Sequence, residues 1–462
     1  MFSHLRWNFV YQRPQHLLAR LAREFRVLYV EEPTHHDGER RLEVIETESG
    51  VTVCRPHLPR RAAGFHDDHI ADLQFLVRQL LEDTGVEDYA VWFYTPMALP
   101  LIDPLRPRAV IYDCMDELSA FLHAPRQIVQ RESALLKRAD LVFTGGPSLY
   151  RSKKERHPSV HCFPSSVDAA HFASARDDER PANRTPTLGF FGVIDERIDL
   201  GLVAALADAH PEWKIVMVGP VVKIPEESLP RRANVEYLGQ RSYQELPGLV
   251  AQWDVCLLPF ALNESTRFIS PTKTLEYMAA GKPSVSTPIN DVVECFGDVV
   301  RIAASQETFI AACEASLAET AEQGAERRRR ADAALEKTSW DRTAQAMRGL
   351  IDSAWRPVAP PASADHTPVA RAGTAPVRAR EVETVVIGAG PTGLSAAYHL
   401  GRDSVLLEAG STVGGWCRSI VDNGFTFDHA GHIMFSNDPY VHELYDKLLG
   451  DNVHWQNREA WI

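Results

Sequence analysis

The sequence predicts an α/β protein with two successive doubly wound domains, a linker and a partial β–α–β unit. Short apolar runs alternate with helical patterns through the first 355 residues, as they do in parallel sheets covered by helices. A stretch rich in Pro and Ala follows, and after it a glycine-rich turn between a strand and a helix. These observations divide the chain into domains at 1–178 and 179–355, a linker at 356–381 and a final region at 382–462.

The first domain is predicted from four apolar runs, each of which ends in polar or turn residues. They lie at 25–33, 89–96, 108–117 and 139–146. Runs of this length and composition indicate buried strands of a parallel sheet. The helical pattern at 66–85 predicts a helix between two of these strands.

A second series of runs predicts the second domain. The runs lie at 186–195, 212–220, 233–239, 253–260 and 282–288. Two successive sets of β/α units imply two doubly wound domains that face one another. The pattern at 337–355 predicts a helix that closes the second domain.

The linker is predicted from composition. It has no apolar period, so it cannot bury enough surface to offset its chain entropy. We therefore expect an extended, disordered connection between the long N-terminal region and the short final one.

The composition also restricts the classes of function. A formal net charge of −13 argues against general nucleic-acid binding, which shows a basic excess. Seven cysteines without a CxxC pair indicate reduced thiols in a cytoplasmic protein. No apolar run approaches the roughly 18 residues of a membrane span, so any membrane contact is expected to be peripheral, at the inner face. The arginine-rich run at 326–337 permits an anionic lipid surface, although its acidic neighbours favour a solvated helix face.

A helix start near residue 271 carries the most informative chemistry. Ser270 is predicted to cap this helix, with Pro271 inside the first turn. The free N–H groups of that turn and the helix dipole form an anion site, to which Lys273 adds a positive charge. Glu276, on the same helix, is placed to accept hydrogen bonds from two sugar hydroxyls. The alternative is an ordinary capped helix with a solvated lysine and glutamate.

The stretch SPTKTLEYMAAGKPSVSTP resembles the nucleotide-sugar-binding segment of family-4 glycosyltransferases of GT-B fold. FPSSVDAAHF, from residue 163, resembles the segment that closes the first domain of that family, and LGFFGVIDERID, from residue 188, resembles its phosphate loop. The resemblance covers residues 1–355 and implies an acceptor domain followed by a nucleotide-sugar donor domain. The donor-binding residues expected on this basis are Arg197, Ser270, Thr272, Lys273, Glu276 and Asn263.

The chain departs from the family pattern at the sugar site. The family carries two glutamates eight positions apart; Glu276 fits the second, but the first falls on Phe268. The role of that first glutamate, contact with the transferred sugar, would pass to Asn263, Glu264 or the backbone near Ser270.

The phosphate loop departs from the pattern as well. Arg197 is its obvious cation, whereas Asp199 lies where another cation is expected. Lys273 is then the candidate for the second positive charge.

Three residues of the first domain are expected to be catalytic. Arg13 and His16 lie where a strand turns into a helix, and Asp116 follows another strand; in open α/β sheets these ends face the ligand. Arg13 would contact the donor phosphate or the acceptor, and its alternative is a helix-cap or surface arginine. The resemblance implies an acid close to the reacting carbon at Asp116, for which the alternative is a solvated loop acid.

The reaction implied by the resemblance is glycosyl transfer from a UDP- or GDP-linked sugar to a hydroxyl acceptor, a glycan or glycolipid. Retention of anomeric configuration without a metal is implied, and the sequence shows no clear DxD pair. Synthesis of an envelope polysaccharide or glycolipid is the expected setting.

The final region contains a dinucleotide fingerprint in its proper context. A strand precedes the glycines and a helix follows them, and Glu408 ends the next strand 20 positions after Gly388, where it suits ribose hydroxyls. A second glycine motif resembles that of flavoprotein oxidases. The cofactor-binding residues expected are Gly388, Gly390, Gly393, Glu408, Gly414, Gly415 and Arg418.

The cofactor expected for a complete domain of this type is FAD. The segment that contains His429, Gly431 and His432 resembles UDP-galactopyranose mutases and amine-oxidase-like proteins. About 80 residues with a one-sided sheet are marginal for an independent domain, so we expect this domain to be truncated and FAD binding to be doubtful. The alternative functions are an FAD-dependent mutase or oxidoreductase with an accessory transferase region, and a binding module that keeps only the transferase shell.

Overall fold

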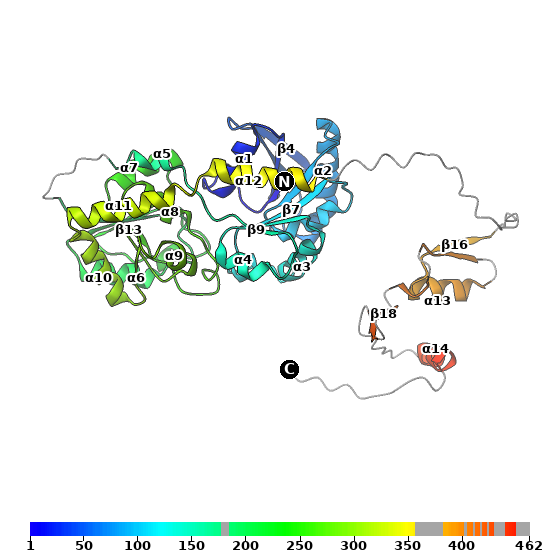
Figure 1. The fold of residues 1–462 in the computed structure, drawn as a ribbon. Helices are drawn as coiled ribbons and strands as arrows, with labels where there is room; N and C mark the ends of the chain where they lie inside the picture. Colours follow the sequence, from blue (N-terminus) through cyan, green and yellow to red (C-terminus); the bar gives the residue numbers. More distant parts are fainter. Residues whose placement is uncertain are drawn as a thin grey trace. The chain divides into compact units, whose positions relative to one another are not determined.

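The computed structural model describes residues 1–176, 184–355, 382–401, 404–409, 412–415, 418–422, 425–428 and 439–449. The chain divides into two compact units, Met1–Ala362 and Ser363–Ile462. The first unit contains two α/β domains, and the second contains a small β–α–β unit (Figure 1). The predicted α/β class is confirmed.

Among the described residues, nine strands form the sheet of the first domain in the order β3-β5-β2-β1-β6-β7-β8-β9, with β4 antiparallel on β5. The other neighbours are parallel. The strands are β1 Phe2–Ser3, β2 Val27–Glu31, β3 Thr34–His35, β4 Arg41–Glu46, β5 Val51–Leu58, β6 Ala90–Phe93, β7 Ala109–Cys114, β8 Leu141–Thr144 and β9 Val160–Cys162. The helices are α1 Arg13–Leu21, α2 Ile70–Thr84, α3 Ile128–Arg138 and α4 Pro147–Lys153, with 3₁₀ turns η1 Asp67–His69, η2 Pro96–Ile102 and η3 Leu118–Ala120.

The hairpin of β4 and β5 was not predicted. The strand β4 alternates charged and apolar residues and is mostly exposed, so it lacks the continuous apolar run by which the other strands are recognised. Glycine at position 50, with φ +80°, makes the turn between the two strands.

The second domain has a six-stranded parallel sheet in the order β12-β11-β10-β13-β14-β15. Numbered in chain order within the domain, this is the 3-2-1-4-5-6 arrangement of a doubly wound sheet. The strands are β10 Thr187–Phe191, β11 Lys214–Val218, β12 Val235–Gly239, β13 Val255–Leu258, β14 Ser284–Ser286 and β15 Arg301–Ile302. The helices are α5 Ala169–Ala173, α6 Leu200–Ala209, α7 Leu246–Ala251, α8 Thr272–Ala279, α9 Asn290–Phe296, α10 Gln306–Leu317 and α11 Ala321–Leu335, with 3₁₀ turns η4 Glu226–Ser228 and η5 Tyr243–Glu245.

The last helix of the first unit, α12 (Trp340–Ala354), follows the second domain in the chain but packs mainly on the first domain, against α1 and β8. Its buried residues Trp340, Met347 and Ile351 share a core with Leu17 and Leu18 of α1, and Figure 1 shows α12 alongside α1. The expected closing helix exists, but its apolar face covers the first domain because that is where α1 exposes a matching stripe.

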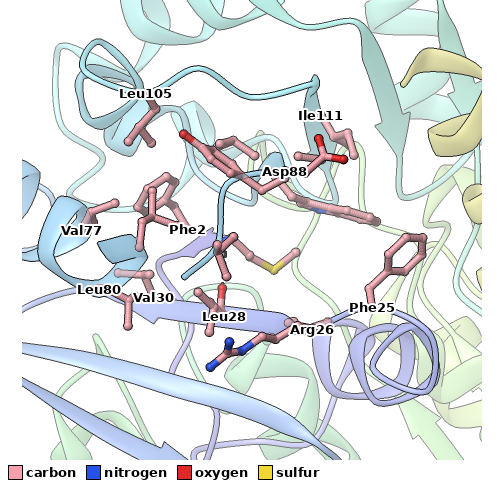
Figure 2. Close-up of a pocket in the computed structure, with 18 of the residues that line it drawn as sticks. Phe2, Phe25, Arg26, Leu28, Val30, Val77, Leu80, Asp88, Leu105 and Ile111 are labelled. Carbon is pink, nitrogen blue, oxygen red and sulfur yellow. Dashed lines mark hydrogen bonds between the residues drawn. The ribbon is translucent and has the colours of Figure 1, made fainter. Parts of the chain in front are cut away.

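A cavity of about 520 Å³ lies at the amino ends of the strands of the first domain. Its lining is mainly apolar, with Phe2, Leu28 and Leu80 among the side chains, and Arg26 and Asp88 are its labelled charged residues (Figure 2). Ligands of open α/β sheets bind at the opposite, carboxyl edge. This cavity is therefore not the candidate active site, although it is the larger one.

The second unit contains the predicted β–α–β unit. Strands β16 (Thr384–Ile387) and β17 (Ser404–Leu407) are parallel, and α13 (Pro391–Leu400) connects them. The antiparallel pair β18 (Ser419–Asp422) and β19 (Phe425–Asp428) and the helix α14 (Pro439–Leu449) complete the described elements. Val385 and Ile387 leave 52% and 85% of their surface exposed, as expected for a sheet covered on one face.

Within the described part of the chain, no helix is both long enough and apolar enough to cross a membrane.

Candidate active site

The carboxyl ends of the two sheets of the first unit meet at a cavity of about 170 Å³, which we call the cleft. All three expected catalytic residues and five of the six expected donor-binding residues line it: Arg13, His16, Asp116, Arg197, Ser270, Thr272, Lys273 and Glu276. These residues are up to 263 positions apart in the sequence, so the fold brings together the chemistry that the motifs predicted separately.

The helix α8 presents its first turn to the cleft. It begins at Thr272 with Pro271 in the cap position, and no side chain caps it. The expected cap at Ser270 is wrong by one residue, because the helix starts at Thr272. The Ser270 carbonyl accepts a hydrogen bond from Ser165 Oγ (2.9 Å), and Ser165 Oγ accepts one from Thr272 Oγ1 (3.1 Å). An uncapped turn leaves backbone N–H groups for an anion.

Lys273 lies against the backbone of Gly192. A Cβ atom at position 192 would lie 2.1 Å from Lys273 Cε and 2.6 Å from Nζ, and φ there is +140°. Among the described residues, the ammonium forms no ion pair; its nearest aromatic contact is Phe190, whose ring centroid is 5.7 Å away. Gly192 therefore makes room for a cation at the end of β10.

Glu276 and Lys273 are a buried pair of opposite charge. Glu276 is 5% exposed. Burial raises the pKa of Glu276 and lowers the pKa of Lys273, while the attraction between the two side chains opposes both shifts. A ligand with a negative diphosphate and hydroxyl donors suits this pair of groups.

Arg197 follows β10 and is held by Asp195. Its Nε and Nη2 lie 3.0 and 2.7 Å from the two Asp195 carboxylate oxygens, and Asp195 is buried. Burial alone lowers the pKa of Arg197, but Asp195 outweighs it and raises the pKa. Asp199, the acid found where a cation was expected, caps α6 by accepting a hydrogen bond from Leu202 N (2.8 Å). Lys273 is the second cation, after Arg197, that the second domain brings to the cleft.

Asp116 lies on the side of the cleft that belongs to the first domain. Burial raises its pKa to about 6, while Arg197 and Lys223 lower it. Asp116 is a half-buried carboxyl group in the loop after β7, where it lines the cleft wall.

Arg13 lines the cleft with its guanidinium already paired. Its Nε and Nη2 lie 3.2 and 3.1 Å from Asp113, and Nη1 donates to the Phe163 carbonyl (2.8 Å). It is 3% exposed, which excludes the alternative of a surface arginine. The pair joins α1 to the end of β7 and supports the backbone that carries Asp116.

His16 is part of an aromatic cluster at the edge of the cleft. Its ring stacks on Trp340 at 4.7 Å and 8° and contacts the edge of Tyr11 at 4.6 Å. Burial lowers its pKa to about 3, so the imidazole is neutral near pH 7 and is a hydrogen-bonding group there, not a cation.

Asn263 is the one expected donor-binding residue that does not line the cleft. Its Oδ1 accepts from Ser265 N (3.0 Å) and Thr266 N (3.2 Å), and its Nδ2 donates to the Glu196 carbonyl (3.3 Å). It shapes the loop before α8. Phe268, which replaces the first glutamate of the family pattern, packs against the core of the first domain.

Sequence reasoning missed Ser165, Glu196, Phe121 and Lys223, which surround the cleft residues. Phe121 and Lys223 belong to no motif in their own segments, whereas Ser165 and Glu196 lie within the stretches FPSSVDAAHF and LGFFGVIDERID without having been singled out there. Their positions depend on how the two domains face each other, which local patterns do not encode.

The second unit brings its two glycine motifs together. Gly414 N donates to the Ala389 carbonyl (2.7 Å), and Glu408 Oε2 accepts from Ala389 N (2.7 Å). A Cβ at Gly393 would lie 1.8 Å from Gly388 O, so glycine is required where α13 begins. The expected residues His429, Gly431 and His432 lie outside the described residues.

The remaining expected residues support the same turn. Gly415 approaches Gly390 so closely that a Cβ at position 415 would lie 3.0 Å from Gly390 Cα. Arg418 Nε donates to the Gly415 carbonyl (3.0 Å). The helix α13 has no side-chain cap, which leaves backbone N–H groups at its first turn.

The described residues contain no group of three or more His, Cys, Asp or Glu side chains that could hold a metal ion.

Comparison with known proteins shows that two parts of the chain match family models. Residues 185–320 match "Glycosyl transferases group 1", and residues 386–448 match "NAD(P)-binding Rossmann-like domain". Over 290 residues the chain is 24% identical to "Putative teichuronic acid biosynthesis glycosyltransferase TuaH" of Bacillus subtilis (strain 168), which covers 52% of this chain and 73% of that protein. Over 66 residues it is 41% identical to Protoporphyrinogen oxidase 2, chloroplastic/mitochondrial, of Arabidopsis thaliana, covering 14% of this chain and 13% of that protein.

Solved structures share the fold of the first unit. Sucrose-phosphate synthase from Thermosynechococcus elongatus has a TM-score of 0.55 at 16% identity and covers 73% of this chain and 91% of that one. "Trehalose-6-phosphate from E. coli bound with UDP-2-fluoro glucose" has a TM-score of 0.56 at 12% identity, over 77% and 98%. Anabaena Alr3699/HepE in complex with UDP has a TM-score of 0.54 at 14% identity, over 74% and 98%.

The fold and the cleft define an enzyme of the GT-B class. The matched domain and the relative specify its activity: the chain is a glycosyltransferase, and residues 185–320 carry the group 1 signature. Within the final region, the similarity to an NAD(P)-binding Rossmann-like domain extends over residues 386–448.

Proposed function

We propose that the cleft binds a UDP-linked sugar and transfers the sugar to a hydroxyl of a glycan or glycolipid acceptor. The observation that carries the proposal is the convergence of the uncapped start of α8, Lys273, Arg197 and buried Glu276 on one cavity. Two of the structures with the same fold hold UDP or a UDP-sugar analogue, which supports UDP over GDP as the carrier.

Each group has a role that follows from its chemistry. The first N–H groups of α8, Lys273 and Arg197 stabilise the negative charge that grows on the departing diphosphate. Glu276 accepts hydrogen bonds from the ribose hydroxyls. Burial strengthens these interactions, because the dielectric response of the cleft is weaker than that of water.

The acceptor side of the cleft is formed by the first domain. Asp116 lies close to the reacting carbon in this proposal and is ionised above a pH of about 6, so that near neutral pH it accepts a hydrogen bond from the acceptor hydroxyl. Arg13 and His16 position this wall of the cleft. We propose retention of anomeric configuration and no metal requirement, in line with the family resemblance.

The biological setting is proposed from the relative. TuaH is described as a glycosyltransferase of teichuronic acid biosynthesis, which supports an envelope polysaccharide or glycolipid as the product. We propose a cytoplasmic protein with peripheral contact at the inner membrane face. The arginine-rich helix α11 contributes little to such contact, because Arg329 and Arg330 pair with Glu326 and Arg327 pairs with Glu319.

The donor class is tested by calorimetric titration of the full chain with UDP and with GDP. UDP is expected to bind more tightly, and Lys273→Ala is expected to weaken UDP binding by about tenfold or more, because a charge-assisted contact to phosphate is lost. Lys337→Ala, at an exposed lysine beyond α11, is the matched control and should bind as the wild type does. Absence of binding by both nucleotides would overturn the proposal.

We propose that the second unit carries the diphosphate- and ribose-binding part of an FAD site, of the kind expected for a complete domain of this type. The close approach of the Gly388–Gly393 turn and the Gly414–Gly415 motif supports it, and so does the similarity to a protoporphyrinogen oxidase. Backbone N–H groups of the turn would hold the diphosphate and Glu408 the ribose; the bound flavin would supply redox chemistry. A mutase of the UDP-galactopyranose type or an amine-oxidase-like enzyme would use such a domain, with the transferase region accessory.

Titration of the chain with FAD and with NADP⁺, followed by fluorescence, tests this site. FAD is expected to bind more tightly, and Gly393→Ala is expected to abolish binding, because its Cβ would collide with Gly388 O. Gly349→Ala, at an open position in α12, is the control. Preferential binding of NADP⁺ would contradict the assignment of FAD.

A further inference from the structure

A segment of the first domain reaches the second domain beside the cleft. Residues 117–123 follow Asp116, and Phe121 in this segment lies near two cations of the second domain. The centroid of its ring is 4.7 Å from Lys223 Nζ and 5.4 Å from Arg197 Cζ. These are cation–π distances, so one aromatic side chain contacts the arginine of the phosphate loop from across the cleft.

The same segment makes a second contact with that loop. Leu122 N donates to Glu196 Oε1 at 3.3 Å, and Lys223 Nζ lies 3.6 Å from the same carboxylate oxygen. Glu196 is thus shared between the backbone of the first domain and a side chain of the second. The contacts of Phe121 and Leu122 form one connection between the domains, which we call the 117–123 bridge.

Both sides of this bridge contain unusual backbone conformations. In the part of the chain that the structure describes, His123 (φ 63°) and Lys223 (φ 64°) are the two non-glycine residues with positive φ. Such conformations carry strain and gather at functional sites. Their occurrence on the two partners of one contact indicates that this contact is specifically shaped.

The electrostatics connect the bridge to both halves of the reaction. Arg197 and Lys223 both lower the pKa of Asp116, against the effect of burial. The Nε and Nη2 atoms of Arg197 are held by Asp195, so Nη1 is left to reach a phosphate. A ring that contacts the guanidinium restricts its remaining freedom of orientation.

We propose that Phe121 is a positioning residue that holds Arg197 in the orientation required by the leaving diphosphate when the two domains close, with Lys223 as its second point of attachment. The proposal rests on the proposed function, because Arg197 needs a diphosphate to stabilise. It adds a contact through which a side chain of the acceptor domain orients Arg197 in the donor site.

Three variants test the role of the ring. Phe121→Leu keeps an apolar side chain but removes the aromatic face, and it is expected to lower kcat for UDP release from a UDP-sugar about tenfold, with the Kd for UDP within about twofold of wild type. Phe121→Tyr keeps the face and should restore most of kcat. Phe75 lies on α2, outside the cleft, and the centroid of its ring is 3.9 Å from Arg40 Cζ. Phe75→Leu removes this ring and should leave kcat unchanged.

The outcomes separate this inference from the proposed function. Failure of the wild type to bind UDP would overturn both. UDP binding together with an unchanged kcat in Phe121→Leu, or a kcat for Phe121→Tyr as low as that for Phe121→Leu, would overturn the positioning role alone.

Amide hydrogen exchange provides a second readout that does not depend on activity. Exchange in residues 117–123 is expected to slow when UDP binds to the wild type, and to slow less in Phe121→Leu, because the bridge is weaker. Equal slowing in the two proteins would overturn the proposal.

Discussion

At the scale of single residues, the cleft keeps charged groups where burial opposes their charge. Burial raises the pKa values of Glu276 and Asp116 and lowers that of Lys273. Charged groups that are desolvated in the free protein reduce its stability and are stabilised when a complementary ligand arrives. This arrangement is typical of functional sites and is unusual for residues that serve only the fold.

Asp116→Asn is expected to raise the free energy of unfolding at pH 7 by about 1–3 kcal/mol. The pKa of Asp116 is about 6 in the folded protein against an ordinary 3.8, so between these values the folded state binds more protons than the unfolded state. The stability contributed by this group therefore falls as the pH rises from about 4 to about 6. Urea unfolding of variant and wild type at pH 7 and at pH 4 measures the effect; a stability difference that is equal at both pH values would contradict the assignment.

Gly192→Ala is expected to weaken UDP binding by at least about tenfold and to cost about 1–3 kcal/mol of stability. The added Cβ would displace Lys273, and the residue has a φ of +140° that alanine rarely adopts. Gly349→Ala is a matched control, because its Cβ meets no atom within 4 Å and it lies within α12; it should stabilise slightly. Calorimetry and thermal unfolding check both variants, and wild-type UDP affinity in Gly192→Ala would disprove the contact.

At the scale of elements, the position of the cleft depends on the helices α8 and α12. The helix α8 brings its uncapped first turn, a lysine and a glutamate to one side of the cavity. The helix α12 starts in the chain after the second domain and ends in the core of the first, so it ties the two domains together beside His16.

Trp340→Ala is expected to cost about 3–5 kcal/mol in the unfolding of the first unit. The side chain is fully buried at the start of α12 and stacks on His16. Arg342→Ala, at an exposed position of the same helix, is expected to change stability by less than about 1 kcal/mol. Urea unfolding followed by circular dichroism compares the two; similar losses would show that α12 does not dock through Trp340.

The elements differ in how well the sequence predicts them. Strands such as β2, β7, β10 and β13 are continuous apolar runs with turn residues behind them, and they occur where they were predicted. The hairpin of β4 and β5 was not predicted from the sequence, because β4 is a charged, exposed strand. The packing of α12 on the first domain was not predicted, because the pattern of an amphipathic helix indicates a buried face but not the element that covers it.

The cleft residues also divide into those that local motifs predict and those that they do not. The lysine and glutamate of α8 and Arg197 belong to local motifs, so their place in the cleft could be predicted. The pairing of Arg13 with Asp113 joins positions 100 residues apart, and the contact of Phe121 with Lys223 joins two domains. Contacts of this kind depend on the tertiary structure, and no local pattern in this sequence predicts them.

At the scale of the whole molecule, we propose two sites of different chemistry, one in each of the two compact units. The first unit brings five of the six residues expected to bind a nucleotide-sugar donor to one cavity. The second brings a glycine turn, a second glycine motif and the carboxylate of Glu408 together, where we propose that a dinucleotide binds. The two sites belong to separate compact units, so variants of one are expected to leave ligand binding at the other unchanged.

Donor turnover by the full chain tests the central claim most directly. The wild type is expected to release UDP from at least one member of a panel of UDP-sugars. Glu276→Ala is expected to lower kcat/KM by roughly 30–100-fold, because the ribose loses its buried acceptor. Glu322→Ala, at an exposed glutamate in the first turn of α11, should match the wild type. A Glu276→Ala enzyme with the kcat/KM of the wild type would contradict the assignment of this cleft as the donor site.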